Sequence, residues 1–220
     1  KLDTVRAMPN LRTTVIPHGP YHFPQATVSK EETRANLGLP SNAKVMLAFG
    51  HIRDNKNLDL VIRAMSPNPD VYLIVAGKEQ SSSRKLISEY QDLAKTVGVA
   101  ERCRWLISFI PDTEAANLFT ASDLVVLTYS QTFRSASGVL NTAVSYRKPC
   151  LASGGKGPLC SVVQNYQLGI WVEPDNVDSI INGIKNWLEQ PLNPEWERYL
   201  EENSWVKNAK LLAENFGKSN

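Results

Sequence analysis

Short apolar runs alternate along the chain with stretches in which apolar residues recur every three or four positions. The runs at 45–49 and 124–127 are apolar throughout, which is typical of parallel strands that helices cover on both faces. The stretches between the runs have the period of an α-helix, most clearly over 177–188. The expected strands are 13–17, 44–49, 71–76, 103–107, 123–128, 149–152 and 170–172.

This alternation of strands and helices predicts an α/β fold, a Rossmann-like doubly wound parallel sheet built from right-handed crossovers. Capping signals support the helices. Ser29 and Glu32 have the spacing of a capping box, for a short helix that stops at Gly38. Asp112 and Asp175 each follow a proline and are expected as helix N-caps.

The composition indicates an ordinary globular chain. Its 220 residues suggest one large domain or two small ones. The net charge of +2 argues against a nucleic-acid-binding protein, which usually carries a basic face. Three cysteines without a CxxC pair, and only three histidines, leave no zinc-like cluster, so no metal site is expected.

Cysteine usage and hydropathy give an expectation for the compartment. The odd number of cysteines, with no close pair, favours a reducing, cytoplasmic environment. The sequence shows no run of about 18 apolar residues for a spanning helix and no recognisable signal peptide. Because the chain starts at Lys1 without a methionine, we expect a fragment of a longer protein.

Ligands of open α/β sheets bind beyond the carboxyl ends of the strands, so the loop after the strand 44–49 is the first candidate site. Gly50 allows a tight turn there, with His51 next to it. Arg53 and Lys56 follow, three residues apart, before the next helix. Two cations beside free backbone N–H groups suit a diphosphate. The alternative is a solvated basic turn in which an aspartate partners one cation.

The loop after the strand 123–128 is the second candidate. Small residues at the start of a helix leave backbone amides pointing outward, which suits phosphate or sugar oxygens. Arg134 adds a positive charge just ahead of them. The alternative is a serine-rich loop that only caps the helix. The small residues concerned are Ser135, Ser137, Gly138 and Val139.

Three other features have weaker signals. The glycines in 154–157 permit close approach of a ligand or form a mobile loop, but this is no Walker motif, because glycine follows the Gly-Lys pair. Gly77 and Lys78 follow a strand and either reach a base or phosphate or form a surface turn. His18 is either an acid–base group or a structural histidine.

Several motifs occur together in a definite order. They are Val-Ile-Pro-His-Gly at 15–19, Leu-Gly-Leu-Pro at 37–40, Phe-Gly-His-Ile-Arg at 49–53, Leu-Ile-Val-Ala-Gly at 73–77, Phe-Ile-Pro-Asp at 109–112, Ala-Ser-Asp-Leu-Val-Val-Leu at 121–127, Ser-Gly-Val-Leu at 137–140 and Leu-Gly-Ile-Trp-Val-Glu-Pro at 168–174. In this order they resemble the C-terminal, donor-binding domain of GT-B glycosyltransferases of family 4, the group 1 transferases. The resemblance covers nearly the whole chain.

The resemblance implies one half of a GT-B fold. Residues 1–220 would form a single nucleotide-sugar-binding domain, with 195–220 as a C-terminal helical extension. A separate N-terminal domain, absent from this chain, would bind the acceptor. The resemblance also implies that Lys56 holds the donor diphosphate. His51 stands where the family has an arginine, so Arg53 would supply that charge.

The chain departs from the family pattern at two positions. The family usually has two glutamates eight residues apart, and here these positions are Arg134 and Thr142. Thr142 would hydrogen-bond a ribose hydroxyl. Arg134 would bind phosphate or pair with an acidic group of the donor or acceptor. The amides of the helix that begins at Ser137 and Gly138 would meet the sugar and the phosphates.

The residues and the resemblance together predict a glycosyltransferase. It would move a hexose from a UDP- or GDP-sugar to a glycan or lipid-linked acceptor in polysaccharide biosynthesis. Arg53, Lys56 and Arg134 would stabilise the departing diphosphate without a metal or cofactor. The isolated domain would be inactive, and the full-length protein cytoplasmic, with peripheral association at the inner face of the membrane as an option.

Two other classes stay open at this point. The loss of both glutamates favours a non-catalytic nucleotide-sugar-binding or partner-binding domain. Another nucleotide-binding α/β enzyme, such as a sugar epimerase, has the same architecture. Titration with nucleotides and nucleotide sugars tests the donor-domain interpretation, and transfer activity separates the enzyme from the binding domain.

Overall fold

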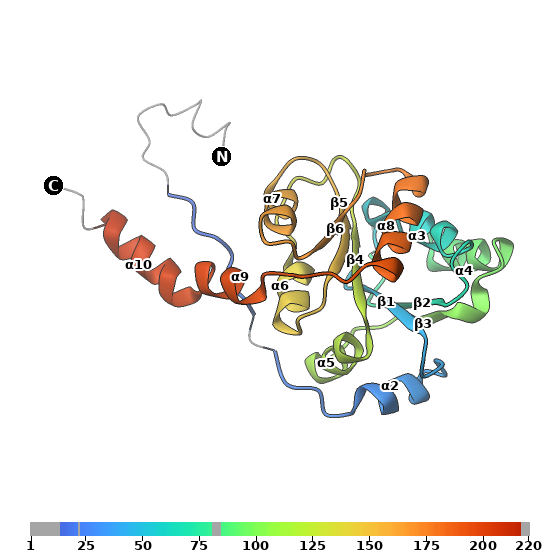
Figure 1. The fold of residues 1–220 in the computed structure, drawn as a ribbon. Coiled ribbons are helices and arrows are strands. Elements are labelled where there is room, and N and C mark those ends of the chain that lie inside the picture. Colours follow the sequence, from blue (N-terminus) through green and yellow to red (C-terminus); the bar gives the residue numbers. More distant parts are fainter. Residues whose placement is uncertain (1–13, 22, 81–84, 217–220) are drawn as a thin grey trace. The chain divides into compact units, whose positions relative to one another are not determined.

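The computed structural model describes residues 14–21, 23–80 and 85–216, and within them six strands form one parallel sheet (Figure 1). The strand order is β3-β2-β1-β4-β5-β6, which is the order of the Rossmann fold. The predicted doubly wound sheet is therefore confirmed. The strands are β1 (Lys44–Phe49), β2 (Val71–Ala76), β3 (Cys103–Leu106), β4 (Leu124–Thr128), β5 (Cys150–Ser153) and β6 (Gly169–Trp171).

The strand order reverses beside β1. From β1 the chain first builds outward through β2 and β3, then returns to place β4 on the other side of β1. Met46 of β1 pairs with Leu124 of β4, so the carboxyl ends of these two strands are neighbours. Loops that leave such a reversal point separate and leave a crevice for a ligand.

Helices cover both faces of this sheet. In Figure 1, α3, α4 and α8 lie on one side, and α5, α6 and α7 lie on the other. The first group packs on a core of alternating strand residues that includes Met46, Leu73 and Leu124, all fully buried. The helices are α2 (Lys30–Asn36), α3 (Leu58–Ala64), α4 (Ile87–Thr96), α5 (Asp112–Ala121), α6 (Gly138–Ser145), α7 (Pro158–Asn165), α8 (Val177–Glu189), α9 (Trp196–Glu202) and α10 (Trp205–Phe216), with 3-10 turns at Asp54–Lys56 and Ala100–Arg102.

The chain divides into two compact units. The sheet and its helices belong to Tyr21–Trp196, and the second unit combines Lys1–Pro20 with Glu197–Asn220. In the second unit, α10 packs on the segment before residue 21. The Trp205 indole N–H donates to the Pro20 carbonyl at 3.0 Å, and the Asn208 amide donates to the Pro17 carbonyl at 2.9 Å.

The predicted strand at 13–17 is wrong where the structure describes it. Residues 14–17 form no strand, and the Pro17 carbonyl accepts from the Asn208 side chain of α10 and not from a neighbouring strand. Residue 13 lies outside the described residues, as do the serines at 81–83. His18 is a structural histidine in this unit. Its Nδ1 lies 2.8 Å from the Gly19 carbonyl oxygen, and its ring lies 6.2 Å from that of Trp205.

The capping predictions are partly confirmed. Ser29 caps α2 by accepting from the Glu32 N–H at 3.1 Å. Asp112 is not an N-cap but the first residue of α5, because Pro111 already holds the extended capping conformation. Asp175 is not a cap either. Its backbone is left-handed, with φ +57°, and Asn176 caps α8 by accepting from the Ser179 N–H at 3.0 Å.

Candidate functional site

The loop after β1 carries the cation pair. Gly50 turns the chain with φ +84°, and Lys56 ends a 3-10 turn before α3 begins. The Lys56 ammonium donates to the Phe49 carbonyl at 2.8 Å. Burial, and the nearby positive charge of Arg53, lower the pKa of Lys56 to about 8. A half-buried ammonium that donates to one carbonyl is able to gain from a bound anion.

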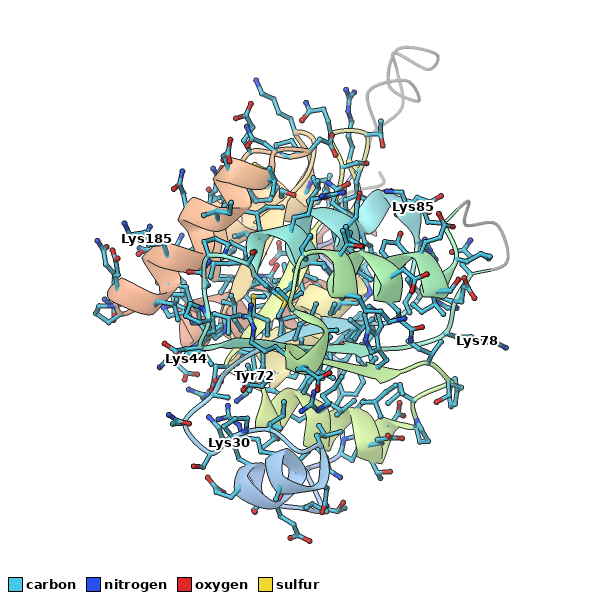
Figure 2. All side chains as sticks on the ribbon, turned by 90° about the vertical axis from the view of Figure 1, so that its right-hand side faces the viewer. Lys30, Lys44, Tyr72, Lys78, Lys85 and Lys185 are labelled. Carbon is cyan, nitrogen blue, oxygen red and sulfur yellow. The ribbon has the colours of Figure 1, made fainter. Side chains whose placement is uncertain are left out.

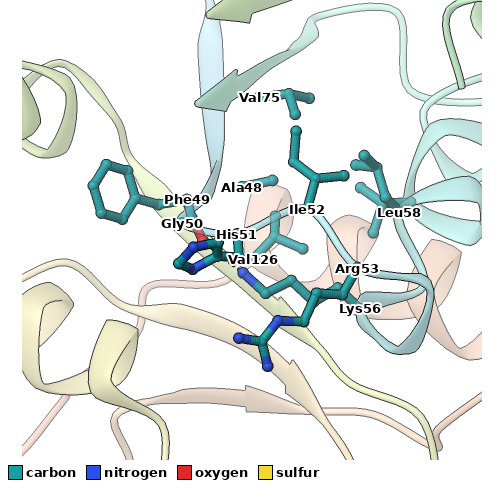
Figure 3. Close-up of a pocket in the computed structure, with 11 residues that line it drawn as sticks. Ala48, Phe49, Gly50, His51, Ile52, Arg53, Lys56, Leu58, Val75 and Val126 are labelled. Atoms are coloured by element: carbon teal, nitrogen blue, oxygen red, sulfur yellow. Dashed lines mark hydrogen bonds between the residues drawn. The ribbon is translucent and has the colours of Figure 1, made fainter. Parts of the chain in front are cut away.

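The side chains of this loop separate by polarity. Figure 3 shows the His51 ring and the Arg53 guanidinium on the opposite side of the loop from Leu58 and Val75. Ile52 is 5% exposed and anchors the loop in the core. The apolar side therefore fixes the loop, while His51 and Arg53, both exposed, are presented to solvent.

A hollow lies between this loop and the start of α6, and we call it the crevice pocket. It sits at the reversal of strand order, where the fold places ligand sites. It combines two cations, the rings of two tyrosines and a phenylalanine, and the N-terminus of a helix. Its lining residues are Tyr21, Gly50, His51, Arg53, Asn55, Lys56, Tyr129, Phe133, Ala136, Ser137, Gly138, Val139 and Thr142.

Tyr129 organises one wall of the crevice pocket. Its ring stacks on that of Phe133, with centroids 3.9 Å apart, and its hydroxyl lies 3.1 Å from Ser137 Oγ. Burial raises the pKa of Tyr129, so the hydroxyl stays neutral. Ser137 in turn caps α6 by accepting from the Leu140 N–H at 3.4 Å. The Thr142 hydroxyl donates to the Gly138 carbonyl at 3.2 Å, so the hydroxyl oxygen remains able to accept a hydrogen bond.

A second hollow, the side pocket, adjoins the crevice pocket at Gly50 and His51. It is mainly apolar, and Phe109 contributes a ring that is 77% exposed. An aromatic ring held open to solvent at the edge of a hollow is suited to stacking on a planar group. The lining residues are Phe23, Phe49, Gly50, His51, Gly77, Lys78, Ser108, Phe109, Ile110, Asp112 and Ala115.

The structure brings most of the predicted site residues to these two hollows. Arg53, Lys56, Ser137, Gly138, Val139 and Thr142 line the crevice pocket, Gly77 and Lys78 line the side pocket, and Gly50 and His51 line both. Lys78 itself is exposed, and Figure 2 shows it extending away from the ribbon.

Arg134 and Ser135 are not brought to the crevice pocket. Both are exposed, and neither is among its lining residues. The loop that carries them packs instead on the glycine-rich loop after β5. A Cβ added to Gly155 would overlap the Gln131 carbonyl oxygen, and one on Gly157 would overlap the backbone of Arg134. Gly155 and Gly157 thus accommodate protein backbone, and approach of a ligand to this loop stays a prediction.

Gly77 has a similar explanation. A Cβ at this position would overlap the Gly50 carbonyl, so glycine lets the loops after β1 and β2 touch. The Ile52 N–H also donates to the Lys78 carbonyl at 3.0 Å. Gly77 therefore shapes the side pocket by bringing two loops together.

Sequence reasoning missed the aromatic residues of both hollows. Tyr129 directly follows β4, at the carboxyl end where candidates were sought, so its position was an available signal. Tyr21 and Phe23 precede the first helix, far from the site in sequence, and no local pattern indicates them. Phe109 was quoted only as part of a motif.

Among residues 14–21, 23–80 and 85–216, no group of three His, Cys, Asp or Glu side chains is placed to hold a metal ion. In the same residues, no helix is long and apolar enough to cross a membrane.

Comparison with known proteins decides the family. The family model described as "Glycosyl transferases group 1" matches residues 29–212. The chain belongs to this family. A D-inositol 3-phosphate glycosyltransferase from Mycobacterium tuberculosis is 31% identical over 164 residues, which are 69% of this chain and 32% of that protein. The enzyme of the same name from Mycobacterium ulcerans is 35% identical over 108 residues, 47% of this chain and 22% of that protein.

Solved structures of this transferase fold agree with the sheet described above. HepE from Anabaena, solved in complex with UDP-glucose, has a TM-score of 0.71 at 20% identity over 86% of this chain and 52% of that one. The C-terminal domain of the group 1 glycosyl transferase LpcC from Francisella tularensis has a TM-score of 0.61 at 17% identity, over 87% of this chain and 95% of that one. At these identities the likeness shows the fold alone. The group 1 chain studied here thus spans about half of HepE and no more than a third of the mycobacterial relatives.

Proposed function

We propose that this chain is the donor-binding part of a glycosyltransferase that moves a hexose from a UDP- or GDP-sugar to a glycan or lipid-linked acceptor. The observation that carries the proposal is the crevice pocket, where Arg53 and Lys56 face the N-terminus of α6 at the reversal of strand order. Cations and a helix N-terminus are the two devices by which proteins hold phosphate oxygens.

Each part of a nucleotide sugar has a counterpart in the two hollows. The diphosphate would lie on Lys56, Arg53 and the first amides of α6. The base would stack against Phe109 in the side pocket, and the Thr142 hydroxyl oxygen would accept from a ribose hydroxyl. The sugar would then point past Tyr129, toward the open side of the crevice.

The chemical step needs stabilisation of the leaving group. When the bond between the anomeric carbon and the diphosphate oxygen breaks, its electron pair stays on the diphosphate. Arg53, Lys56 and the α6 amides would lower the energy of that charge electrostatically, so the proposal requires no metal or cofactor. Arg134 is left out of this set, because it does not line the crevice pocket.

The acceptor side of the reaction is also part of the proposal. A general base and the acceptor site would come from another domain, since the chain spans about half of solved relatives such as HepE. The isolated chain would bind donor and turn over little. The whole protein would work in the cytoplasm, at the inner face of the membrane, in polysaccharide biosynthesis.

A second candidate is a non-catalytic domain that binds nucleotide sugars. The observation in its favour is that none of the described residues lining the crevice pocket is acidic. The two family glutamates are replaced by an exposed Arg134 and by Thr142. Both candidates predict nucleotide binding, and they differ only in transfer activity.

Calorimetric titration of the 220-residue chain with UDP, GDP, ADP and UDP-glucose tests the proposal. We expect one nucleoside diphosphate to bind, and its affinity to fall at least about tenfold in Arg53→Ala and in Lys56→Ala, since each removes a charge-assisted hydrogen bond. Arg134→Ala and Lys185→Ala, which remove exposed cations that line neither hollow, are the matched controls and should change affinity less than about twofold.

Absence of binding by all four compounds would overturn the proposal. Equal losses in the four variants would show that net charge, and not the crevice pocket, attracts nucleotides. Sugar transfer by the full-length protein, abolished by Lys56→Ala, would select the enzyme over the non-catalytic domain.

A further inference from the structure

Two non-glycine residues with left-handed backbones meet beside the crevice pocket. Asn57, with φ +51°, follows Lys56, and Asp175, with φ +57°, precedes the N-cap of α8. The Asn57 side-chain amide donates to Asp175 Oδ1 at 2.8 Å, across 118 residues of sequence. L-residues other than glycine rarely adopt this conformation, and asparagine and aspartate are among those that tolerate it.

The second carboxylate oxygen of Asp175 holds the opposite wall of the pocket. It accepts from the Gln131 backbone N–H at 2.9 Å. Gln131 lies between Tyr129 and Phe133, the stacked pair that lines the crevice pocket. One carboxylate therefore joins the turn that follows the phosphate-facing Lys56 to the loop that carries the aromatic wall.

The carboxylate has no part in capping the helix that follows it. Asn176 supplies the α8 cap through its own side chain, at 3.0 Å from the Ser179 N–H. Asp175 is itself exposed, so it adds little to the core. Its two recorded hydrogen bonds both go to segments that flank the crevice pocket.

Two further bonds join the same two loops at fixed points. The Ser130 N–H donates to the Asn55 carbonyl, and the Thr128 hydroxyl donates to the Lys56 carbonyl, both at 2.9 Å. These bonds lie on the β4 side of the turn. Asp175 adds a third tie from the α8 side, which limits rotation of the turn about the other two.

We propose that Asp175 is a positioning residue of the donor site. Its carboxylate sets the spacing between the Lys56 ammonium and the wall formed by Tyr129 and Phe133, and Asn57 is its partner in doing so. The consequence for donor binding rests on the proposed function. The bridge itself does not, and the test has separate readouts for the two.

Glycine is the informative substitution at both ends of the bridge. In Asn57→Gly and Asp175→Gly the left-handed backbone is kept without strain, and only the side-chain bonds are lost. Gln167→Gly is the matched control, because Gln167 also has a left-handed backbone, with φ +53°, and lines neither the crevice nor the side pocket.

The first readout is hydrogen exchange of the Gln131 amide by NMR, without nucleotide. Asp175→Gly removes its acceptor, so exchange should accelerate about tenfold or more. Asn57→Gly should also accelerate it, by about threefold, because the carboxylate is no longer held. Gln167→Gly should leave it unchanged. Unaltered exchange in Asn57→Gly would overturn the bridge, whether or not the chain binds a nucleotide.

The second readout is UDP affinity by calorimetry. Each glycine variant should bind UDP about three- to tenfold more weakly, because a smaller fraction of molecules holds the competent spacing. The double variant should bind no more weakly than Asp175→Gly, since both changes break one tie. Asp175→Asn keeps an acceptor for Asn57 but loses the charge. Its UDP affinity should lie between those of wild type and Asp175→Gly.

The two readouts separate the possible failures. Faster exchange with unchanged UDP affinity would overturn the positioning role. An equal loss of UDP affinity in Gln167→Gly would show that the effect is general destabilisation. This result would also overturn the positioning role of Asp175. If the wild-type chain binds no UDP, GDP or ADP, the proposed function fails, while the exchange rates still decide the bridge.

Discussion

Cations gather at both ends of the sheet, and the two groups differ in their partners. At the amino end, Lys30 and Arg34 each lie 2.7 Å from a carboxylate oxygen of Asp123. Figure 2 shows Lys30 beside the ribbon at that end. At the carboxyl end, Arg53 and Lys56 line a pocket to which no described acidic residue contributes. The first group is paired with a carboxylate of the protein, whereas the second lines a pocket without an acidic residue.

Two lysines make the contrast sharper. Burial lowers the pKa of Lys148 to about 8, as it does for Lys56. Lys148 donates to the Thr120 and Ser122 carbonyls at 3.0 and 2.8 Å, and so closes the end of α5. Lys56 has one recorded acceptor and borders a pocket. A lowered pKa by itself does not mark a binding site, and the surrounding acceptors distinguish the two roles.

The largest expected effect is on stability, at the amino end. Asp123→Ala should lower the free energy of unfolding by about 3–5 kcal/mol, because it leaves the buried Arg34 guanidinium without its counter-charge. Arg34 is 4% exposed and also donates to three backbone carbonyls, so it has no path to solvent. Urea denaturation measures the loss. The UDP affinity of the folded protein should stay unchanged. A decrease of less than about 1 kcal/mol in the free energy of unfolding would contradict the structural role of Asp123.

Acid should produce a weaker form of the same effect. Burial opposes ionisation of Asp123, but hydrogen bonds from Lys30, the Val45 N–H and Arg34 outweigh it, and its pKa lies below the usual value. The stability from this group is therefore present above the ordinary carboxyl pKa and is lost as pH falls through the lower folded value.

The second prediction exchanges the two lysines for methionine. Lys56→Met should weaken UDP binding about tenfold or more with little net change in stability, since removal of a desolvated charge offsets the loss of one donor to the Phe49 carbonyl. Lys148→Met should leave UDP affinity unchanged but lower the free energy of unfolding by about 1–3 kcal/mol, because two carbonyls lose their donor. Calorimetry measures the UDP affinity of both variants, and urea denaturation measures their free energy of unfolding. Similar behaviour of the two variants would remove the distinction between the groups.

Much of the fold was predictable because local patterns and the sheet agree. The strands β1 and β2 match their predicted bounds, since both are central strands with an apolar, largely buried middle. β3 and β4 differ from their predicted bounds by one residue at one end, and β5 and β6 by one residue at both ends, where pairing with a neighbour decides the last hydrogen bond. The segment 14–17 has β-branched residues but packs on α10, which no local signal reveals.

The site was predictable where a strand fixes it. Gly50, Arg53 and Lys56 follow a buried strand, so their place at its carboxyl end follows from the strand alone. The role of Arg134 stays a prediction, because the placement of its loop depends on packing against glycines some twenty residues away, which no local pattern reveals. The tie from Asp175 depends on a 118-residue contact, and its sequence signal suggested only a cap.

The third prediction is that pH moves binding and stability in opposite directions. Lys56 has a folded pKa of about 8 against an ordinary 10.5, so above pH 8 the unfolded chain holds a proton that the folded chain has lost. Stability should therefore rise with pH between about 8 and 10.5, with Lys148 contributing in the same sense. UDP affinity should fall about fourfold between pH 7 and 8.5, as the ammonium loses its proton.

The matched variants separate these contributions. In Lys56→Met the pH dependence of UDP affinity should flatten, while part of the rise in stability persists through Lys148. In Lys148→Met the affinity profile should match that of wild type. An affinity that stays constant through pH 8.5 in the wild type would mean that Lys56 does not supply its charge to the ligand.

The smallest expected effect is at the rim of the side pocket. Phe109→Ala should weaken binding of the nucleoside diphosphate by about three- to tenfold, the order of one base–aromatic stacking contact. Stability should hardly change, because the ring is 77% exposed and has little contact area to lose. Inorganic pyrophosphate is the discriminating probe, since it has no base. Its affinity should be the same in Phe109→Ala and in wild type but should fall in Lys56→Met. A loss of pyrophosphate affinity in Phe109→Ala would mean that the ring supports the phosphate loop, and the side pocket would then be no base site.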